Sequence, residues 1–218
     1  MSQDLSIKIK DLGIEDYPIT FDKMHKFTES RDASTIDEIW FVEHNKVFTQ
    51  GHNGNDANIL LKSDIPIVYS DRGGQITYHG PGQLIMYILI DLKRIKVLNK
   101  DFDMHSIVHC LETSVIDLLK TYNIISYAKN DAPGVYVNNK KISSLGIKVK
   151  KGCTFHGIAI NIDMDLSPFL NINPCGYSGL EMCQLKDLTE NNIDLTKIKN
   201  NLVKTITKLI GYNNIIFK

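Results

Sequence analysis

The amino-acid sequence predicts an α/β or α+β fold in which helices flank one mixed β-sheet. Two stretches place apolar residues at helical spacing, whereas shorter runs rich in Val, Ile and aromatic residues, bounded by turn signals, indicate strands. At 218 residues, with 43% hydrophobic residues, the chain can bury one sizeable core. No repeat and no Pro-, Gly- or Ser-rich linker divides it, so we expect residues 1–218 to form one domain.

The first half of the chain begins with a helix over about Tyr17–Arg31, followed by a strand at Glu38–Glu43. A polar loop through Gln50–Asp56 and a short strand at Ile65–Tyr69 come next. The run Leu84–Leu92 is almost continuously apolar, which is typical of a strand covered on both faces. We therefore expect this run to be a central strand.

The second half opens with the clearest helix, over residues 101–121, and ends with a helix over about 195–210. Between them, strands at 134–137, 141–149 and 154–162, joined by turn signals, predict an antiparallel meander. The apolar stripe of the first helix comprises Met104, Ile107, Val108, Leu111, Val115, Leu118 and Leu119. The terminal helix is expected to bury Ile198, Leu202, Val203, Ile206 and Leu209.

The charge and composition of the chain indicate which classes of partner it can bind and in which compartment it is expected. Lys plus Arg and Asp plus Glu both number 25, so no overall field attracts nucleic acid or an acidic membrane surface. Charged residues interrupt residues 1–18, which therefore lack the apolar core of a signal peptide, and no run of about 18 apolar residues follows. We expect a cytoplasmic protein with neither nucleic-acid nor membrane partners.

The loop Arg72–Gln83 carries four glycines between two predicted strands. Glycine allows a backbone to approach a ligand closely or to adopt positive φ, but a long hairpin connection with a Gly-Pro-Gly turn explains the same composition. The loop lacks the Gly-Lys-Ser/Thr and G-x-G-x-x-G patterns of phosphate-binding loops. Arg72, Thr77, Tyr78 and His79 could orient a substrate, or His79 could serve as a structural hydrogen-bonding residue.

The cysteines are too few for a disulfide scaffold and form no C-x-x-C pair, so we interpret them as reduced thiols. Together with His156, three of them have the ligand types of a zinc site but not its usual spacing. His105 and His109 lack the glutamate of an H-E-x-x-H motif. No metal is expected. The four cysteines are Cys110, Cys153, Cys175 and Cys183.

Cys175 and a lysine of the meander are the candidates for chemistry. Cys175 lies in the turn-rich segment Asn171–Gly179, where a thiol can be reached from solvent, whereas Cys110 on the apolar helix fits a packed core residue. A nearby lysine can favour the thiolate of a cysteine without a histidine. Lys140 and Lys141 are adjacent in a strand and point to opposite faces, so at most one enters a site.

Four blocks together resemble the lipoyl(octanoyl) transferases, and they occur in that family's order. The blocks are Arg72–Gln83, Lys141–Gly146, Gly152–Gly157 and Asn173–Gly179. The resemblance covers about residues 40–190, and it implies the fold shared with the catalytic domains of lipoate and biotin protein ligases. It also selects Lys141 over Lys140.

In that family the cysteine of the last block carries the acyl group as a thioester, and the lysine of the second favours its thiolate; these positions match Cys175 and Lys141. Backbone amides near Cys175 are the expected donors to the oxyanion. The resemblance also implies that three segments contact the substrate. Their residues are Arg72, Gly73, Gly74, Gln75, Ile76, Thr77, Tyr78, His79, Ser144, Leu145, Gly146, Gly157, Ile158 and Ala159.

The implied activity is transfer of an octanoyl group from acyl carrier protein to a lysine of lipoyl-domain proteins, such as 2-oxoacid dehydrogenase E2 subunits and glycine cleavage H protein. No cofactor is needed, because exchange between thioesters and formation of an amide from a thioester require no ATP. Alternative readings are an amidotransferase between lipoyl domains, an ATP-dependent lipoate-protein ligase, a thiol hydrolase and a non-catalytic acyl-binding module. The sequence leaves the preferred chain length open.

Overall fold

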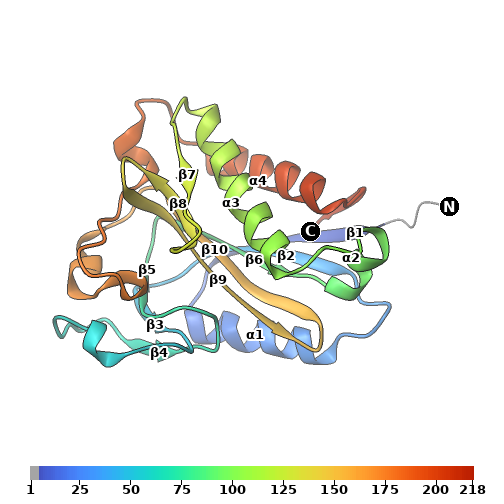
Figure 1. The fold of residues 1–218 in the computed structure, drawn as a ribbon, viewed down its shortest axis with the longest axis horizontal. Coiled ribbons are helices and arrows are strands. Elements are labelled where there is room, and N and C mark those ends of the chain that lie inside the picture. The colour runs from blue at the N-terminus through green and yellow to red at the C-terminus, as the bar shows by residue number, and fades with distance from the viewer. Residues whose placement is uncertain (1–4) are drawn as a thin grey trace.

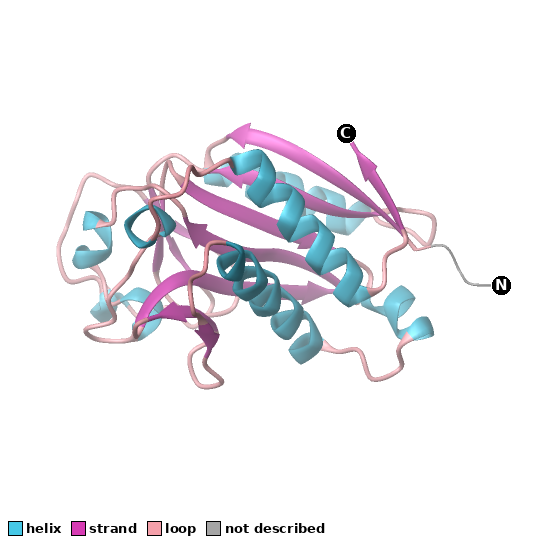
Figure 2. Ribbon diagram, turned by 90° about the horizontal axis from the view of Figure 1, so that it is seen from above, coloured by secondary structure: helices cyan, strands magenta, loops and turns pink. Residues whose placement is uncertain are grey.

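The computed structural model describes residues 5–218, which form a sheet between two layers of helices (Figure 1). Helix α1 (Tyr17–Ser30) covers one face of the main sheet, and α3 (Met104–Thr121) and α4 (Leu195–Ile210) cover the other. Viewed from above, α3 and α4 lie side by side across the strands (Figure 2). The predicted fold class, a mixed sheet flanked by helices, is confirmed.

The main sheet has eight strands. The three strands at one edge are parallel to one another, and all other neighbouring pairs are antiparallel, including the predicted meander. In spatial order the strands are β11 (Asn214–Phe217), β1 (Ser6–Ile14), β2 (Asp37–Glu43), β6 (Gln83–Leu89), β10 (Cys153–Asn161), β9 (Lys140–Lys150), β8 (Gly134–Val137) and β7 (Tyr127–Ala128).

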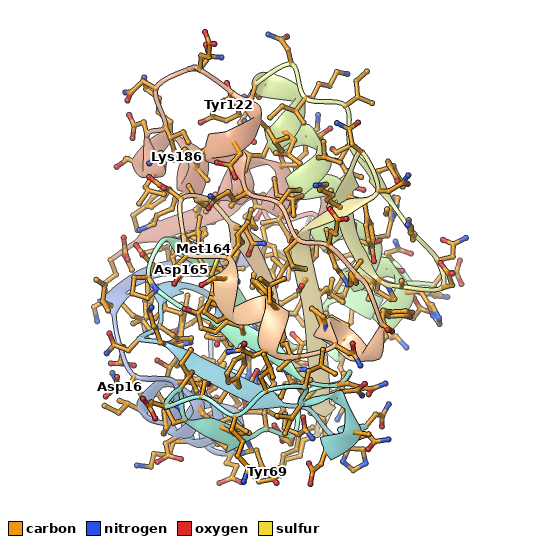
Figure 3. The ribbon with its side chains drawn as sticks, turned by 90° about the vertical axis from the view of Figure 1, so that its left-hand side faces the viewer. Asp16, Tyr69, Tyr122, Met164, Asp165 and Lys186 are labelled. Carbon is orange, nitrogen blue, oxygen red and sulfur yellow. The ribbon has the colours of Figure 1, made fainter. Side chains whose placement is uncertain are left out.

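A second sheet of three short strands lies at one end of the main sheet (Figure 1). Its order is β4 (Ile67–Tyr69), β3 (Val47–Gln50) and β5 (Thr77–His79). Figure 3 views the molecule from this end, with Tyr69 on the small sheet and Met164 on the segment that follows β10. A separate apolar cluster joins the two regions: Phe48, Ile76, Tyr78, Met164, Phe169 and Ile172.

Local sequence explains where the main elements begin and end. Every residue of β6 is buried, because the strand has neighbours on both edges and helices on both faces, as its apolar run predicts. Helix α3 begins after Asp103, whose carboxylate accepts a hydrogen bond from the Ser106 amide, while the Asp103 amide donates to the Ser106 hydroxyl oxygen. Helix α4 begins after Asp194 and ends at Gly211, which has the left-handed φ of 99° common at helix ends.

Several elements differ from the sequence prediction. Strand β1 lies within the N-terminal stretch for which the sequence predicts no strand: Ile7 and Ile9 face the core, while the alternating Lys8 and Lys10 pair with Glu38. The predicted strand 84–92 ends at Leu89, and a short helix, α2 (Leu92–Leu98), follows. Leu209 is 40% exposed, and Ile210 takes the buried position expected of it.

The Gly-rich segment is predicted to be a loop, but part of it, Thr77–His79, forms strand β5. The turn that follows requires glycine: Gly82 has φ of 84°, and a Cβ there would lie 1.8 Å from the Asp163 carbonyl oxygen. The positive φ and the close backbone packing of this turn therefore explain why position 82 is a glycine, without a role in ligand binding. Within residues 5–218, no helix is both long and apolar enough to cross a membrane.

Candidate active site

Cys175 lies in a tight turn over Pro174–Gly176, beyond the end of β10. Its backbone has φ of 58° and ψ of 16°, a left-handed conformation that residues other than glycine rarely adopt. Such strain concentrates at functional sites, where the surrounding structure holds it in place. Here the Cys175 amide donates to the Ile76 carbonyl at 2.8 Å, which ties the turn to the Gly-rich segment. The turn presents a free thiol that is only partly buried.

Lys141 approaches this turn from strand β9. Its side chain is 1% exposed, whereas the neighbouring Lys140 is exposed and pairs with Glu181. The prediction that the two lysines point to opposite faces, one of them solvated, is confirmed. The Lys141 amide donates to the Glu181 carbonyl at 2.8 Å, and the Lys141 carbonyl accepts from the Cys183 amide at 3.0 Å. The lysine is therefore fixed by two backbone hydrogen bonds to the Glu181–Cys183 segment along one edge of its strand.

The Lys141 Nζ atom lies 3.6 Å from the Cys175 Sγ atom. The Tyr136 ring lies 5.4 Å from the same Nζ atom, within range of a cation–π contact. Gly134 makes room for the lysine, since a Cβ at that position would lie 2.5 Å from Lys141 Cε. An ammonium group this close to a thiol, with little water around it, stabilises the thiolate. The structure thus places the two residues predicted for chemistry, Cys175 and Lys141, side by side.

A buried carboxyl group, Glu112 of α3, lies behind this pair. It accepts a hydrogen bond from the Gly134 amide at 2.7 Å. Burial raises the pKa of Glu112, while that hydrogen bond and the charges of His109 and Lys141 oppose the increase. Glu112 and the Lys141 side chain therefore lie against the same glycine, Gly134.

A cavity of about 350 Å³ adjoins the cysteine–lysine pair, a size typical of small-molecule sites. Two residues expected to contact substrate do not line it. The Ile76 and Tyr78 side chains are buried in the cluster at the small sheet, although the Ile76 carbonyl holds Cys175. The expected residues that do line it are Arg72, Gly73, Gly74, Gln75, Thr77, His79, Lys141, Ser144, Leu145, Gly146, Gly157, Ile158, Ala159 and Cys175.

Sequence reasoning missed the part of the lining that comes from other elements. Met104 and Val108 belong to the apolar stripe of α3, which was interpreted as core, yet both are only half-buried and line the cavity. Tyr17 of α1 and Tyr87 of β6 line it from the opposite face of the sheet. No local pattern marks these residues, because only the fold brings them together. The remaining additions are Ile85, Ala132, Pro133, Ile147, His156 and Tyr177.

Arg72 lines the cavity, but its guanidinium group is committed to the protein's own backbone. It donates to the carbonyls of Thr49 at 2.6 Å, Gln75 at 2.8 Å and Gly73 at 2.9 Å. Bonds from one planar group to three carbonyls fix the path of the loop. Arg72 shapes the cavity wall, and its direct contact with substrate stays a prediction.

Two buried histidines, His79 and His156, line the cavity, and a third, His44, contacts the lining residues Tyr17 and Tyr87. Burial lowers the pKa of His44 to about 4 and that of His79 to about 3. The His79 ring bonds Gln83 at 2.7 Å and Thr49 at 3.2 Å, so His79 is a structural hydrogen-bonding residue that also faces the cavity. His156 pairs with Asp71 at 2.9 Å, and burial lowers the pKa of His156 as well. The His44 and His79 rings are therefore uncharged at neutral pH.

Because the pKa values of these buried histidines are low, we expect the folded protein to lose stability in mild acid. The unfolded chain binds a proton at each histidine near pH 6.5, whereas folded His44 and His79 resist protonation down to pKa values of about 4 and 3. Their contribution is fully present above pH 6.5 and falls as the pH drops, by up to about 1.4 kcal/mol per pH unit for each ring. Thermal unfolding between pH 7 and pH 5 should show the melting temperature falling, with a smaller slope for His44→Gln. Equal melting temperatures at pH 7 and pH 5 would contradict this assignment.

The candidate zinc ligands do not form a cluster. Among residues 5–218, no three His, Cys, Asp or Glu side chains are grouped as metal ligands would be. Cys153 and Cys183 are buried, and burial raises the pKa of both thiols, so neither is an activated nucleophile. Cys110 is buried within the core cluster, as predicted.

Comparison with known proteins places the chain in a family. The model of the lipoyl protein ligase A/B catalytic domain matches residues 16–207. An octanoyltransferase of Histophilus somni (strain 129Pt) is 53% identical over 213 residues, covering 97% of this chain and 98% of that protein. An octanoyltransferase of Aliivibrio fischeri is 51% identical over 214 residues, covering 95% and 93%. The resemblance inferred from the four sequence blocks is thereby confirmed.

Solved structures with little sequence similarity share the fold. A putative lipoate protein ligase from T. acidophilum with bound lipoic acid superposes with a TM-score of 0.76 at 14% identity, covering 98% of this chain and 88% of that one. A biotin protein ligase from Aquifex aeolicus gives a TM-score of 0.55 at 14% identity, covering 95% and 70%. The chain belongs to the lipoyl protein ligase A/B catalytic-domain family, together with its octanoyltransferases, and is an acyltransferase of protein lipoylation.

Proposed function

We propose that the protein takes an octanoyl group from acyl carrier protein onto Cys175 as a thioester and passes it to the ε-amine of a lysine on a lipoyl domain. The contact of 3.6 Å between Lys141 Nζ and Cys175 Sγ, beside a cavity, is the observation that carries this proposal. The donor, the intermediate and the acceptors rest on the family resemblance and on the chemistry of this pair. Residues 1–218 act as one catalytic domain, and the cytoplasm remains its expected compartment.

In the first step the Cys175 thiolate attacks the thioester carbonyl of the donor. The new S–C bond forms, the tetrahedral intermediate collapses, and the carrier's thiolate leaves. Lys141 gives its proton to that departing thiolate, so the carrier leaves as a neutral thiol. One thioester replaces another, and the step is nearly thermoneutral.

In the second step the acceptor amine attacks the Cys175 thioester. An amide bond forms and the Cys175 thiolate leaves, while the nitrogen must lose a proton. Lys141, neutral after the first step, accepts that proton and returns to its ammonium form. The starting ammonium–thiolate pair is restored without an outside base, and formation of an amide from a thioester drives the reaction without ATP.

The cavity lining suits a medium-length acyl chain. Met104, Val108, Leu145 and Ile158 supply apolar surface, and glycines 73, 74, 146 and 157 also line the cavity. Burial of a methylene contributes roughly 0.8 kcal/mol, so a bound eight-carbon chain gains several kcal/mol. This gain in binding free energy favours an octanoyl donor over a thioester with a short acyl chain.

A donor comparison with purified components tests the proposal. Transfer to a lipoyl domain is measured with three donors: octanoyl carrier protein, an octanoylated lipoyl domain, and octanoate plus ATP. We expect fast transfer from the carrier protein without ATP, and ping-pong kinetics. Preference for the acylated lipoyl domain would indicate an amidotransferase, and a strict need for ATP would indicate a ligase.

Two further outcomes separate the remaining alternatives. Release of free octanoate at the same rate with or without acceptor would identify a hydrolase. Binding of octanoyl carrier protein with no transfer and no release would identify an acyl-binding module. Either outcome would contradict the proposed transferase function.

A further inference from the structure

The proposed chemistry requires a donor for the oxyanion that forms twice on the octanoyl carbonyl oxygen. The backbone amides nearest the nucleophile are already used: Cys175 donates to the Ile76 carbonyl at 2.8 Å, Gly176 to Asn173 at 2.9 Å, and Tyr177 to Pro174 at 3.1 Å. These bonds hold the strained turn, so these amides cannot supply the expected donors without breaking it. Lys141 is engaged with the sulfur atom and with the leaving group.

The Gln75 side chain lies directly against this turn. A Cβ built on Gly176 would lie 2.2 Å from Gln75 Nε2 and 2.4 Å from Gln75 Cδ, so the amide group packs on the residue that follows the nucleophile. Gly176 has φ of 81°, and only the absence of a side chain there lets the amide approach. Gln75 also lines the cavity, as Cys175 does. Its amide therefore lies at the cavity wall, against the residue that follows Cys175.

A chain of side-chain amides fixes which way the Gln75 amide is turned. Asn173 Nδ2 donates to Asn58 Oδ1 at 3.3 Å, and Asn58 Nδ2 donates in turn to Gln75 Oε1. With Oε1 occupied, Nε2 is directed away from Asn58, and it has no acceptor among residues 5–218. Two amide groups thus hold one N–H₂ donor against Gly176, the residue after the nucleophile, and leave it free.

We propose that Gln75 Nε2 donates the hydrogen bond that stabilises the oxyanion of both tetrahedral intermediates, and that the Asn58–Asn173 pair positions it. This inference rests on the proposed function and adds a catalytic residue to it. A donor fixed before the reaction costs no reorganisation when negative charge develops on the oxygen. The carbonyl of either thioester accepts a weaker bond in the ground state, so the effect falls on kcat more than on KM.

Single-turnover kinetics of Gln75→Leu and Gln75→Glu test this role. Leucine keeps the bulk of the side chain without a donor; glutamate keeps its shape and the acceptor for Asn58, but its carboxylate repels an oxyanion. We expect both variants to slow acylation of Cys175 by octanoyl carrier protein, and deacylation by the lipoyl domain, by a similar factor of about 10². Thermal unfolding establishes that each variant is folded.

Alkylation of Cys175 by iodoacetamide is the matched control, because this reaction uses the same thiolate but forms no oxyanion. Its rate should stay at the wild-type value in Gln75→Leu, which adds no charge near the thiolate. An equal fall in alkylation would overturn the proposal, since Gln75 would then merely hold the turn or the thiolate. Acylation at the wild-type rate in both variants would overturn it as well.

The wild-type enzyme separates failure of this inference from failure of the proposed function. If wild-type Cys175 forms no octanoyl thioester, the transferase proposal fails, and the role of Gln75 fails with it. If the wild-type protein acylates normally and the Gln75 variants match it, only the oxyanion assignment is wrong. Asn58→Ala should give an intermediate loss in both half-reactions, because it frees the Gln75 amide to rotate; a loss larger than that of Gln75→Leu would contradict the positioning role.

Discussion

Replacing Cys175 with serine is expected to lower octanoyl transfer by about 10³-fold or more, because a hydroxyl group is far harder to ionise than a thiol. The substitution changes one atom at a partly buried position, so the fold should be retained. Steady-state transfer from octanoyl carrier protein to a lipoyl domain measures the loss. The melting temperature should change little.

Cys153→Ala provides the matched control for the nucleophile. Cys153 begins strand β10, is buried, and lies outside the cavity lining, so its removal should leave transfer near the wild-type rate. Full activity of Cys175→Ser would remove the basis for a covalent intermediate. Loss of activity in Cys153→Ala at unchanged stability would show that cysteine reactivity has been assigned to the wrong residue.

Replacing Lys141 with methionine is expected to lower transfer by about 10²–10⁴-fold. Two roles are lost, and their magnitudes differ. An ordinary thiol with a pKa near 8.5 is still roughly one-tenth thiolate at pH 7.5, so loss of the thiolate partner alone costs about tenfold. The larger part comes from loss of the group that accepts the proton of the attacking amine. Methionine fills the buried volume without an uncompensated charge, so the variant should fold.

Separate measurement of alkylation and of transfer in the Lys141→Met variant distinguishes the two roles. Alkylation of Cys175, which needs only the thiolate, should slow by about tenfold or less, while the amide-forming half-reaction, which also needs a proton acceptor, should slow much more. Lys140→Met is the control, because that neighbouring side chain is exposed and pairs only with Glu181. Wild-type alkylation and transfer in Lys141→Met would exclude the lysine from the mechanism.

The parts of the fold that the sequence predicts are those with a strong local pattern. The stripe of α3, the apolar run of β6 and the terminal helix α4 each bury a periodic set of residues and appear close to their predicted bounds. Strand β11 has no such signal, since most of its residues are exposed and it exists through pairing with β1. Its place in the sheet depends on a contact between the two ends of the chain.

The residues of the candidate site likewise fall into two groups: those that the sequence predicts and those that only the fold brings into place. Cys175 and Lys141 stand in short blocks whose combination is specific, and the structure brings their side chains together. Glu112 looks like any polar residue on an amphipathic helix, and its position behind Lys141 appears only once α3 packs beside β8. Gln75 lies in a recognisable block, but the direction of its amide depends on Asn58, a residue of a separate segment.

The intact mass of the enzyme after incubation with octanoyl carrier protein, without acceptor, tests the covalent mechanism most directly. The mechanism predicts a mass increase of one octanoyl group on the peptide that contains Cys175, which hydroxylamine removes and which disappears when a lipoyl domain is added. The Cys175→Ser variant should show no thioester adduct. Transfer that proceeds while no adduct forms on Cys175 at any time during turnover would contradict the mechanism.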